Sequence, residues 1–222
     1  MIFTLSIILF LIFAYFTIGM FDIRRNIFVK SINSIEKGNI CLTFDDGPDS
    51  IMTPKILDIL QKYNVQANFF LIGEASQNNQ DIVKRIHIEG HTIGCHTFFH
   101  KTTFPMYSLS RMETELVKTN NVIKSITSEE VVLFRPPFGI TNPNIKKTLK
   151  KLAMTSVGWD IRSLDTITKD AKKLSNRVIN GINKGGSIIL FHDRCESTLS
   201  ILENIIIYCH EKGLKFKTIN NA

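Results

Sequence analysis

The sequence predicts an α/β protein, in which helices cover a parallel β-sheet and one apolar helix precedes the sheet. After Gly38, short apolar runs alternate with longer amphipathic runs, and this alternation is typical of parallel sheets. The 222 residues, 44% of them hydrophobic, suit one domain with a real core. The periodicity fits an open sheet and a closed barrel equally well.

The apolar helix is expected over Ile2–Phe21, a run without charged residues that would span about 30 Å. A cleaved signal peptide would carry basic residues before this run and a small-x-small site after it, whereas residues 17–20 are Thr-Ile-Gly-Met. A helix buried in the domain would be expected to show a polar face. We favour an uncleaved membrane anchor over 1–22, which contacts membrane lipid, then a linker over 23–37 and a folded domain over 38–222.

The charges beside the anchor bear on which side of the membrane the domain faces. Arg24, Arg25 and Lys30 follow the anchor and no Lys or Arg precedes it, which favours a cytoplasmic domain. This signal is only three residues, partly offset by Asp22, and a folded domain can cross a membrane despite such a flank.

Six apolar runs are expected as buried strands and six amphipathic runs as helices. The strands are Ile40–Phe44, Ala67–Ile72, Thr92–Cys95, Val131–Phe134, Met154–Gly158 and Ser187–Phe191. The helices are Thr53–Tyr63, Gln80–Glu89, Ser108–Ser125, Asn144–Leu152, Asp170–Asn183 and Thr198–Lys212. Parallel sheets carry their active sites at the carboxyl ends of the strands, so the polar residues there are the candidate site.

The composition excludes several classes of protein. A net charge of +7 would fit nucleic acid, anionic lipid or acidic glycans, but the lysines are scattered and no aromatic platform accompanies them, so no nucleic-acid partner is predicted. The four cysteines lack a CxxC pair, which indicates neither a zinc ribbon nor a disulfide framework. They are expected to be buried thiols, and a single disulfide between two of them is the alternative. No pattern predicts an oligomeric state.

Two adjacent carboxylates, Asp45 and Asp46, follow the first strand and precede a Gly-Pro turn. One can face a metal ion and the other a reacting water, although Asp-Asp-Gly also occurs as a helix cap or turn. His96 and His100 follow the third strand at i and i+4, the spacing of two metal ligands on one face of a helical turn. With one carboxylate they form the open three-ligand site of hydrolytic metal ions.

Other strand ends add polar residues to this set. The Arg135-to-Gly139 segment contains two prolines that would hold an arginine and a few backbone amides rigidly, although it also fits a surface turn. Asp160, Asp165 and the strand end Leu190-Phe191-His192-Asp193 complete the expected ring and offer a further histidine with an acid to orient it. The remaining histidines are expected to be structural: His87, His91 and His210.

The motifs resemble those of the polysaccharide deacetylase family, carbohydrate esterase family 4. TFDDGP, HTFFH, RPPFG, WDIRSLD and LFHD occur in the order and spacing of the family's five motifs, and the match runs from about Gly38 to the C-terminus. The resemblance implies a distorted (β/α) barrel with fewer than eight strands, here preceded by a transmembrane helix. It also implies a hydrolase that removes N-acetyl groups from sugars.

The resemblance assigns a metal site and a place for the acetyl group. Asp46, His96 and His100 are similar to the ligands of one divalent metal ion, usually zinc and in some members cobalt or nickel. The backbone N–H of Phe138 matches the amide that stabilises the oxyanion, and Leu190 resembles the residue that lines the acetyl pocket.

The resemblance also assigns the groups that move protons. Asp45 looks like the catalytic base and Arg135 like the arginine that holds it in place. His192 resembles the general acid, with Asp165 as its carboxylate partner.

The chain departs from the usual family motifs at four positions. Thr166 follows Asp165 where tryptophan is common, and Phe138 stands where tyrosine is common. Asn68 and Cys95 replace residues that are often Thr and Asn. These changes bear on the substrate and leave the expected metal ligands untouched.

The expected substrate is a glycan, a peptidoglycan strand or a lipid-linked amino sugar, with acetate as a product. Two alternatives are an amidohydrolase or O-acetyl esterase of the same fold, and a catalytically silent, membrane-anchored glycan-binding protein. The second would be favoured by a lost base or ligand, and none is lost. Anchored family members mostly face outward, so we favour the outer face of the cytoplasmic membrane, and a cytoplasmic domain would suit a lipid-linked precursor.

Overall fold

The computed structural model describes residues 2–219. Its strands are β1 (Ser31–Ile32), β2 (Asn39–Asp45), β3 (Asn68–Leu71), β4 (Thr92–Cys95), β5 (Leu133–Phe134), β6 (Thr155–Val157), β7 (Ile161–Arg162), β8 (Ile188–His192) and β9 (Lys215–Phe216). Its α-helices are α1 (Ile2–Phe21), α2 (Met52–Lys62), α3 (Gly73–Asn78), α4 (Gln80–Ile88), α5 (Leu109–Thr127), α6 (Pro143–Lys151), α7 (Ala171–Asn183) and α8 (Glu196–Glu211). Three short 3-10 helices are η1 (Ile23–Arg25), η2 (Phe104–Met106) and η3 (Pro137–Gly139).

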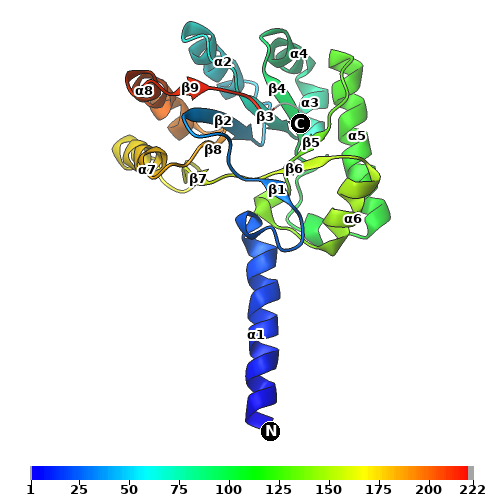
Figure 1. The fold of residues 1–222 in the computed structure, drawn as a ribbon. Helices are drawn as coiled ribbons and strands as arrows, with labels where there is room; N and C mark the ends of the chain where they lie inside the picture. Colours follow the sequence, from blue (N-terminus) through cyan, green and yellow to red (C-terminus); the bar gives the residue numbers. More distant parts are fainter. Residues whose placement is uncertain (1, 220–222) are drawn as a thin grey trace.

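The strands form one curled parallel sheet in the order β1-β6-β5-β4-β3-β2-β8-β7, with β9 paired to β2. Helices α2 to α8 form an arc around its outer side (Figure 1). The two end strands, β1 and β7, do not pair with each other, so the barrel is open on one side. The predicted class, a distorted (β/α) barrel after one apolar helix, is confirmed.

The number of strands is higher than expected. All six predicted strands are present, but three more join the sheet, β1, β7 and β9, which gives nine in the described residues. Each of these three has only two residues, too few to show a period of alternation in the sequence. Each of them is recognised as a strand only by its pairing with a neighbouring strand. The expectation of fewer than eight strands is therefore wrong.

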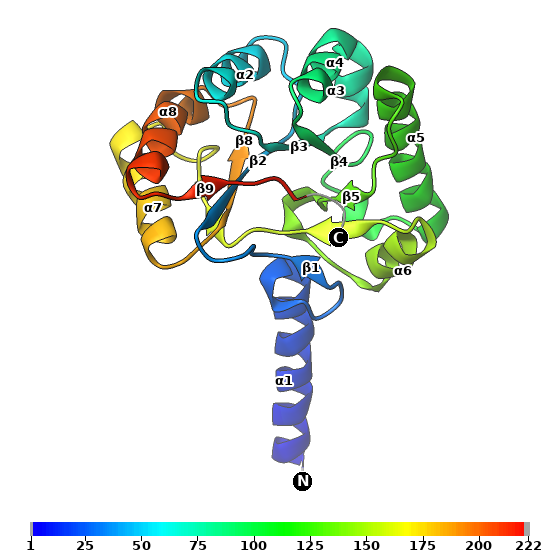
Figure 2. The ribbon, with the colours of Figure 1, turned by 45° about the horizontal axis from the view of Figure 1, so that its top comes forward.

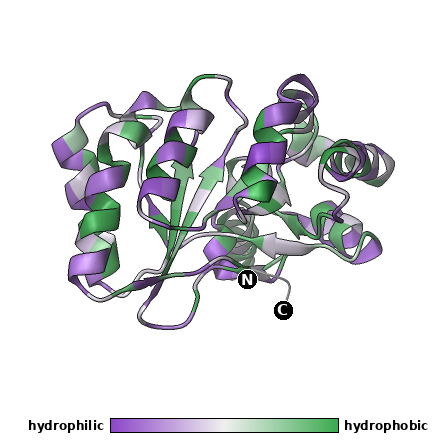
Figure 3. Ribbon diagram, turned by 90° about the horizontal axis from the view of Figure 1, so that it is seen from above, coloured by the Kyte–Doolittle hydropathy of each residue, from purple (hydrophilic) through white to green (hydrophobic). Residues whose placement is uncertain are grey.

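Strand β2 lies in the middle of the sheet and is buried along its whole length. The ring of Phe44 stacks on Phe69 and Phe191 of the neighbouring strands, with centroid distances of 5.0 and 5.8 Å. Because alternate side chains of a strand point to opposite faces, Thr43 and Asp45 point the other way, into the barrel. Figure 3 shows the apolar strands at the centre of the domain, with helices of mixed hydropathy around them.

The apolar helix α1 extends away from the domain as a single rod (Figures 1 and 2). Residues Thr4–Phe21 of this helix have a mean hydropathy of 2.2 and are almost all outside the core of the domain. By length and composition, the helix could cross a membrane. A signal sequence near an N-terminus would pass the same test.

Residues 23–37, expected as a linker, pack on the domain instead. Strand β1 pairs with β6, and Ile23 is only 2% exposed. At the end of α1, Thr141 donates hydrogen bonds to the carbonyls of Met20 (2.9 Å) and Gly19 (2.8 Å). The segment thus covers one edge of the sheet and ties α1 to the loop after η3.

Candidate active site

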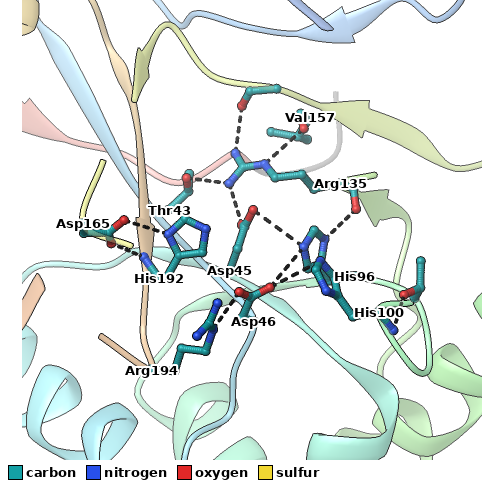
Figure 4. A network of polar contacts seen from close by, with 12 residues as sticks. Thr43, Asp45, Asp46, His96, His100, Arg135, Val157, Asp165, His192 and Arg194 are labelled. Carbon is teal, nitrogen blue, oxygen red and sulfur yellow. Dashed lines mark hydrogen bonds and ion pairs between the residues drawn. The ribbon is translucent and has the colours of Figure 1, made fainter. Parts of the chain in front are cut away.

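The predicted site residues meet at the carboxyl ends of the strands (Figure 4). Asp45 and Asp46 follow from β2, the two histidines from the loop after β4, and Arg135 from the end of β5. Strands β2 and β8 are neighbours, and their register places His192 beside Asp45. The topology of the sheet therefore brings together residues that are far apart in the sequence.

Asp46, His96 and His100 form a compact cluster, in which one ligand atom from each lies within 4.8 Å of the others. The Nε2 atoms of His96 and His100 lie 3.5 and 3.4 Å from Asp46 Oδ1. His96 Nδ1 lies 2.7 Å from the Arg135 carbonyl, which can only accept, so Nδ1 carries the proton and Nε2 presents a lone pair. Two imidazole nitrogens and one carboxylate oxygen fit a divalent metal ion such as zinc.

The loop that carries the two histidines is not the helical turn that their spacing predicts. Thr97 and His100 have left-handed backbones, with φ of 66° and 49°. Buried Glu115 on α5 accepts hydrogen bonds from the backbone N–H groups of Phe98 (3.0 Å) and Phe99 (3.1 Å), which holds the loop in this bend. The imidazoles still meet, with ring centroids 4.6 Å apart.

The electrostatics of the cluster favour a bound cation. Burial, with the nearby His96 charge, lowers the pKa of His100 to about 4, so its imidazole is neutral at neutral pH. Burial opposes ionisation of Asp46, but the neighbouring histidine side chains, that of His96 first, hold the pKa of this carboxyl below the ordinary value. Neutral imidazoles and an ionised carboxylate are the forms that bind metal ions.

Arg135 holds Asp45 from inside the barrel. Both are buried, and Nη1 of the arginine donates to Asp45 Oδ1 at 2.7 Å and to Thr43 Oγ1 at 2.7 Å. Its other nitrogens donate to the carbonyls of Val157 (3.2 Å) and Gly158 (2.7 Å). The second carboxylate oxygen, Oδ2, lies 3.8 Å from His96 Nε2 and so faces the cluster.

His192 and Asp165 form a second charged pair next to this centre. Asp165 accepts from His192 Nδ1 at 2.8 Å, from its backbone N–H at 2.7 Å and from the Thr198 hydroxyl at 2.5 Å. Burial alone would lower the pKa of His192, but the Asp165 carboxylate raises it above the ordinary value. Because Nδ1 is held by Asp165, Nε2 is the nitrogen left to exchange a proton.

The residues expected at the acetyl group lie at the rim and in the wall of the barrel. Phe138 is 50% exposed, has φ of 60° and places its ring centroid 5.0 Å from that of His100. Leu190 is buried on β8, where its register partners are Thr43 and Arg162.

Asp160 lies outside the site, contrary to expectation. Its carboxylate accepts hydrogen bonds from the backbone N–H groups of Ser187 and Ile188, at 2.9 and 2.7 Å. Asp160 therefore stabilises the start of β8. Of the acids expected to orient the further histidine, Asp165 is the one that contacts His192.

The two residues after the LFHD histidine also contribute: Asp193 belongs to the expected ring, and Arg194 was missed by the sequence analysis. Arg194 donates from Nε to Asp46 Oδ2 at 2.8 Å, which leaves Oδ1 facing the histidines. Asp193 is fully buried, accepts from the Thr53 hydroxyl at 2.7 Å, and burial raises its pKa to about 7. A Cβ on Gly47 would lie 1.9 Å from this carboxylate, which explains the glycine after the aspartate pair. The place of Arg194 directly after the LFHD motif is the sequence signal that could have put this residue at the strand end, although it does not indicate the partner.

The remaining histidines and the cysteines have structural positions. His91 is buried and accepts from the Ala67 N–H at 3.2 Å, as predicted. His87 is half-buried on α4, and His210 is exposed on α8, as expected. All four cysteines are free: Cys41, Cys95 and Cys209 are buried, and Cys195 is half-buried.

This fold and cluster define a parallel α/β half-barrel with a candidate metal centre at its strand ends. The family model for polysaccharide deacetylase matches residues 33–157. The chain belongs to the polysaccharide deacetylase family, whose members are generally metal-dependent.

Relatives within the family act on cell-wall sugars according to their names. Peptidoglycan-N-acetylglucosamine deacetylase of Bacillus cereus is 34% identical over 187 residues, which cover 82% of this chain and 67% of the relative. PgdA of Listeria monocytogenes, named for the same activity, is 31% identical, and the chain spans only 38% of its length.

Solved structures show the same fold. The Bc1960 peptidoglycan N-acetylglucosamine deacetylase has a TM-score of 0.80 and 32% identity, covering 85% of this chain and 90% of that one. A CE4-family pseudoenzyme from Bacillus anthracis has a TM-score of 0.77 and 29% identity, covering 83% of this chain and 64% of that one. Family membership alone therefore does not establish activity.

Proposed function

We propose that the chain is a metal-dependent N-deacetylase that removes acetyl groups from the N-acetylated sugars of a cell-wall glycan. The observation that carries the proposal is the placement of three functional groups around one space. A carboxylate oxygen of Asp45 faces the Asp46/His96/His100 cluster, and His192 lies on the neighbouring strand. A silent binding protein would not need this complete set.

The candidate metal ligands have the donor set that a zinc ion requires, and cobalt or nickel would fit the same ligands. A bound divalent ion supplies Lewis-acid activation of a water and of the acetyl carbonyl. Asp46, His96 and His100 would hold it, while Arg194 keeps the second oxygen of Asp46 occupied.

The chain's own residues would move the protons. Asp45 Oδ2 takes the proton from the attacking water, while Arg135 holds Oδ1 and keeps the carboxylate oriented. The backbone N–H of Phe138 stabilises the oxyanion of the tetrahedral intermediate. His192, kept protonated by Asp165, gives a proton to the departing amine, so that acetate and a free amino sugar are formed.

The test is acetate release by the full-length, zinc-loaded chain from N-acetylglucosamine oligomers, peptidoglycan fragments and lipid-linked N-acetylated sugars. We expect acetate and free amine in equal amounts from at least one substrate, and about 10²–10⁴-fold slower release of both by the Asp45→Asn variant. Acetate release from O-acetylated glycans alone, without a free amine, would show an esterase instead. No release from any substrate would contradict the proposal.

We also propose that α1 anchors the enzyme in the cytoplasmic membrane, with the domain on the outer face, where cell-wall glycans are found. The support is the length and hydropathy of α1 together with the cell-wall activity named for the relatives. The substrate would then be peptidoglycan, and a lipid-linked amino sugar is the substrate to expect if the domain faces the cytoplasm.

A further inference from the structure

A groove of about 530 Å³ runs between the free edge of β7 and helix α7, outside the active site. Its lining includes four cationic side chains, Arg162, Lys173, Arg177 and Lys184. The amide side chains of Asn176 and Asn180 also line it. The groove therefore offers charged and neutral hydrogen-bond donors along its length.

The charges of these cations are not neutralised by close ion pairs within the part of the chain that the structure describes. None of the four forms an ion pair there. The one acid in the lining, Asp160, is already bound by the backbone N–H groups of Ser187 and Ile188. Arg177 Nε donates to the Arg162 carbonyl at 2.7 Å, which fixes this guanidinium against β7. An anion is the ligand that such a groove would bind.

One end of the groove lies close to the base of α1. A Cβ on Gly158, two residues before Asp160, would lie 3.2 Å from the side chain of Ile23 in η1. Asp22 and, more weakly, Asp160 raise the pKa of Arg24, so Asp160 is within electrostatic range of this residue. In Figure 1, β7 and α7 lie in the half of the domain from which α1 leaves. The groove thus begins where the headgroups of a membrane crossed by α1 would lie.

The other end of the groove carries an exposed apolar side chain. Leu164 and Thr168 line it there, and Ile167 between them is 70% exposed. A cationic surface beside an exposed aliphatic residue is the combination that binds the interface of an anionic bilayer.

We propose that the β7/α7 groove binds the phosphates of anionic lipid headgroups and docks the domain on the membrane that holds α1. This proposal rests on α1 being a membrane span, and it does not depend on the deacetylase activity. Docking through β7 would fix the direction in which the active site opens, since β7 leads directly to Asp165.

The test is amide hydrogen–deuterium exchange of the full-length chain in two kinds of nanodisc, one of phosphatidylcholine and one with phosphatidylglycerol added. We expect slower exchange over residues 160–168 in the anionic discs, and loss of this protection at high salt. In the Lys173→Gln/Lys184→Gln variant, protection should need more phosphatidylglycerol, because each cation near a surface contributes roughly fivefold to binding.

The matched control is Lys55→Gln/Lys84→Gln, which removes the same charge from exposed positions on α2 and α4, away from α1 (Figure 1). It should behave like the wild type. Equal exchange in both discs, equal behaviour of the two variants, or protection by inorganic phosphate in phosphatidylcholine discs would each overturn the proposal. Acetate release from soluble oligomers should be the same in both variants, so a failure of docking is distinct from a failure of the proposed activity.

Discussion

Arg135 and Asp165 each hold one candidate proton-transfer group in a fixed orientation. Arg135 donates a hydrogen bond to Oδ1 of Asp45, and Oδ2 faces the Asp46/His96/His100 cluster. Asp165 accepts a hydrogen bond from Nδ1 of His192, and Nε2 is left for proton exchange. In both pairs, a buried charge decides which atom of its partner is available for chemistry.

Asp45 is expected to act as a base and not to support the fold. In Asp45→Asn, the amide oxygen can still accept from Arg135, so the fold and the metal content should persist. Turnover should fall by about 10²–10⁴-fold, the usual contribution of a general base. Steady-state kinetics and elemental analysis of the same preparation check this, with Asp81→Asn, at an exposed position of α4, as the control. Near-normal kcat in Asp45→Asn would refute the assignment.

The His192–Asp165 pair predicts a pH dependence. A general acid works in its protonated form, so kcat/KM should fall as the pH rises through the pKa of His192. Asp165 raises this pKa, and Asp165→Asn should therefore move the alkaline limb to lower pH. The acidic limb, which would report the base, should not move. An unchanged alkaline limb in the variant would argue against the pair.

Arg135 links the strands that carry the site through its hydrogen bonds. From the end of β5 it reaches Thr43 and Asp45 on β2 and the carbonyl of Val157 on β6. Three strands of the open barrel are thus joined through one fully buried guanidinium.

Replacing this arginine should cost far more stability than replacing one at the surface. Arg135→Met leaves the Asp45 charge buried and unpaired, which typically costs about 3–5 kcal/mol. For a chain of this length, that lowers Tm by roughly 6–20 °C, measured by thermal unfolding in detergent. The control is Arg85→Met, which breaks two partly exposed ion pairs and should cost about 0–1 kcal/mol. Equal Tm values for the two variants would contradict this role.

The sequence predicts the longer elements well because their patterns are local. The six predicted helices and six predicted strands lie within two residues of the expected ends, whereas the short helix α3 was not predicted. It misses β1, β7 and β9, since a two-residue strand exists only through its partner. It also mistakes the His96–His100 loop for a helical turn, because Glu115, from a distant helix, decides that conformation.

The sequence predicts the part of the site that lies at the strand ends and misses the contacts that depend on the tertiary structure. Strand ends of a parallel sheet meet, so Asp45, Asp46 and the two histidines can be grouped without a structure. The bond from Arg194 to Asp46 joins residues 148 positions apart, and no local pattern indicates it. Asp160 is misplaced because its backbone partners on β8 depend on the sheet register.

For the whole molecule, α1 and the domain form one continuous unit. The last turn of α1 is hydrogen-bonded to Thr141, three residues after Phe138 at the rim of the site. If α1 crosses the membrane, the active site is held close to the lipid surface.

The side of the membrane can be tested with a reporter at the C-terminus. An outward-facing domain predicts an active alkaline phosphatase fusion, because that enzyme folds only outside the cytoplasm, where its disulfides form. A fluorescent-protein fusion that folds only in the cytoplasm is the matched control and should be dark. The reverse result would place the domain inside and make a lipid-linked precursor the first substrate to test.

The most direct test of the account is a zinc titration of the metal-free, full-length chain, followed by acetate release from an N-acetylglucosamine oligomer. We expect no release without metal, and full activity at one zinc ion per chain bound by Asp46, His96 and His100. The His96→Ala variant should neither retain the ion nor recover activity. Undiminished acetate release by the metal-free chain would contradict the central claim.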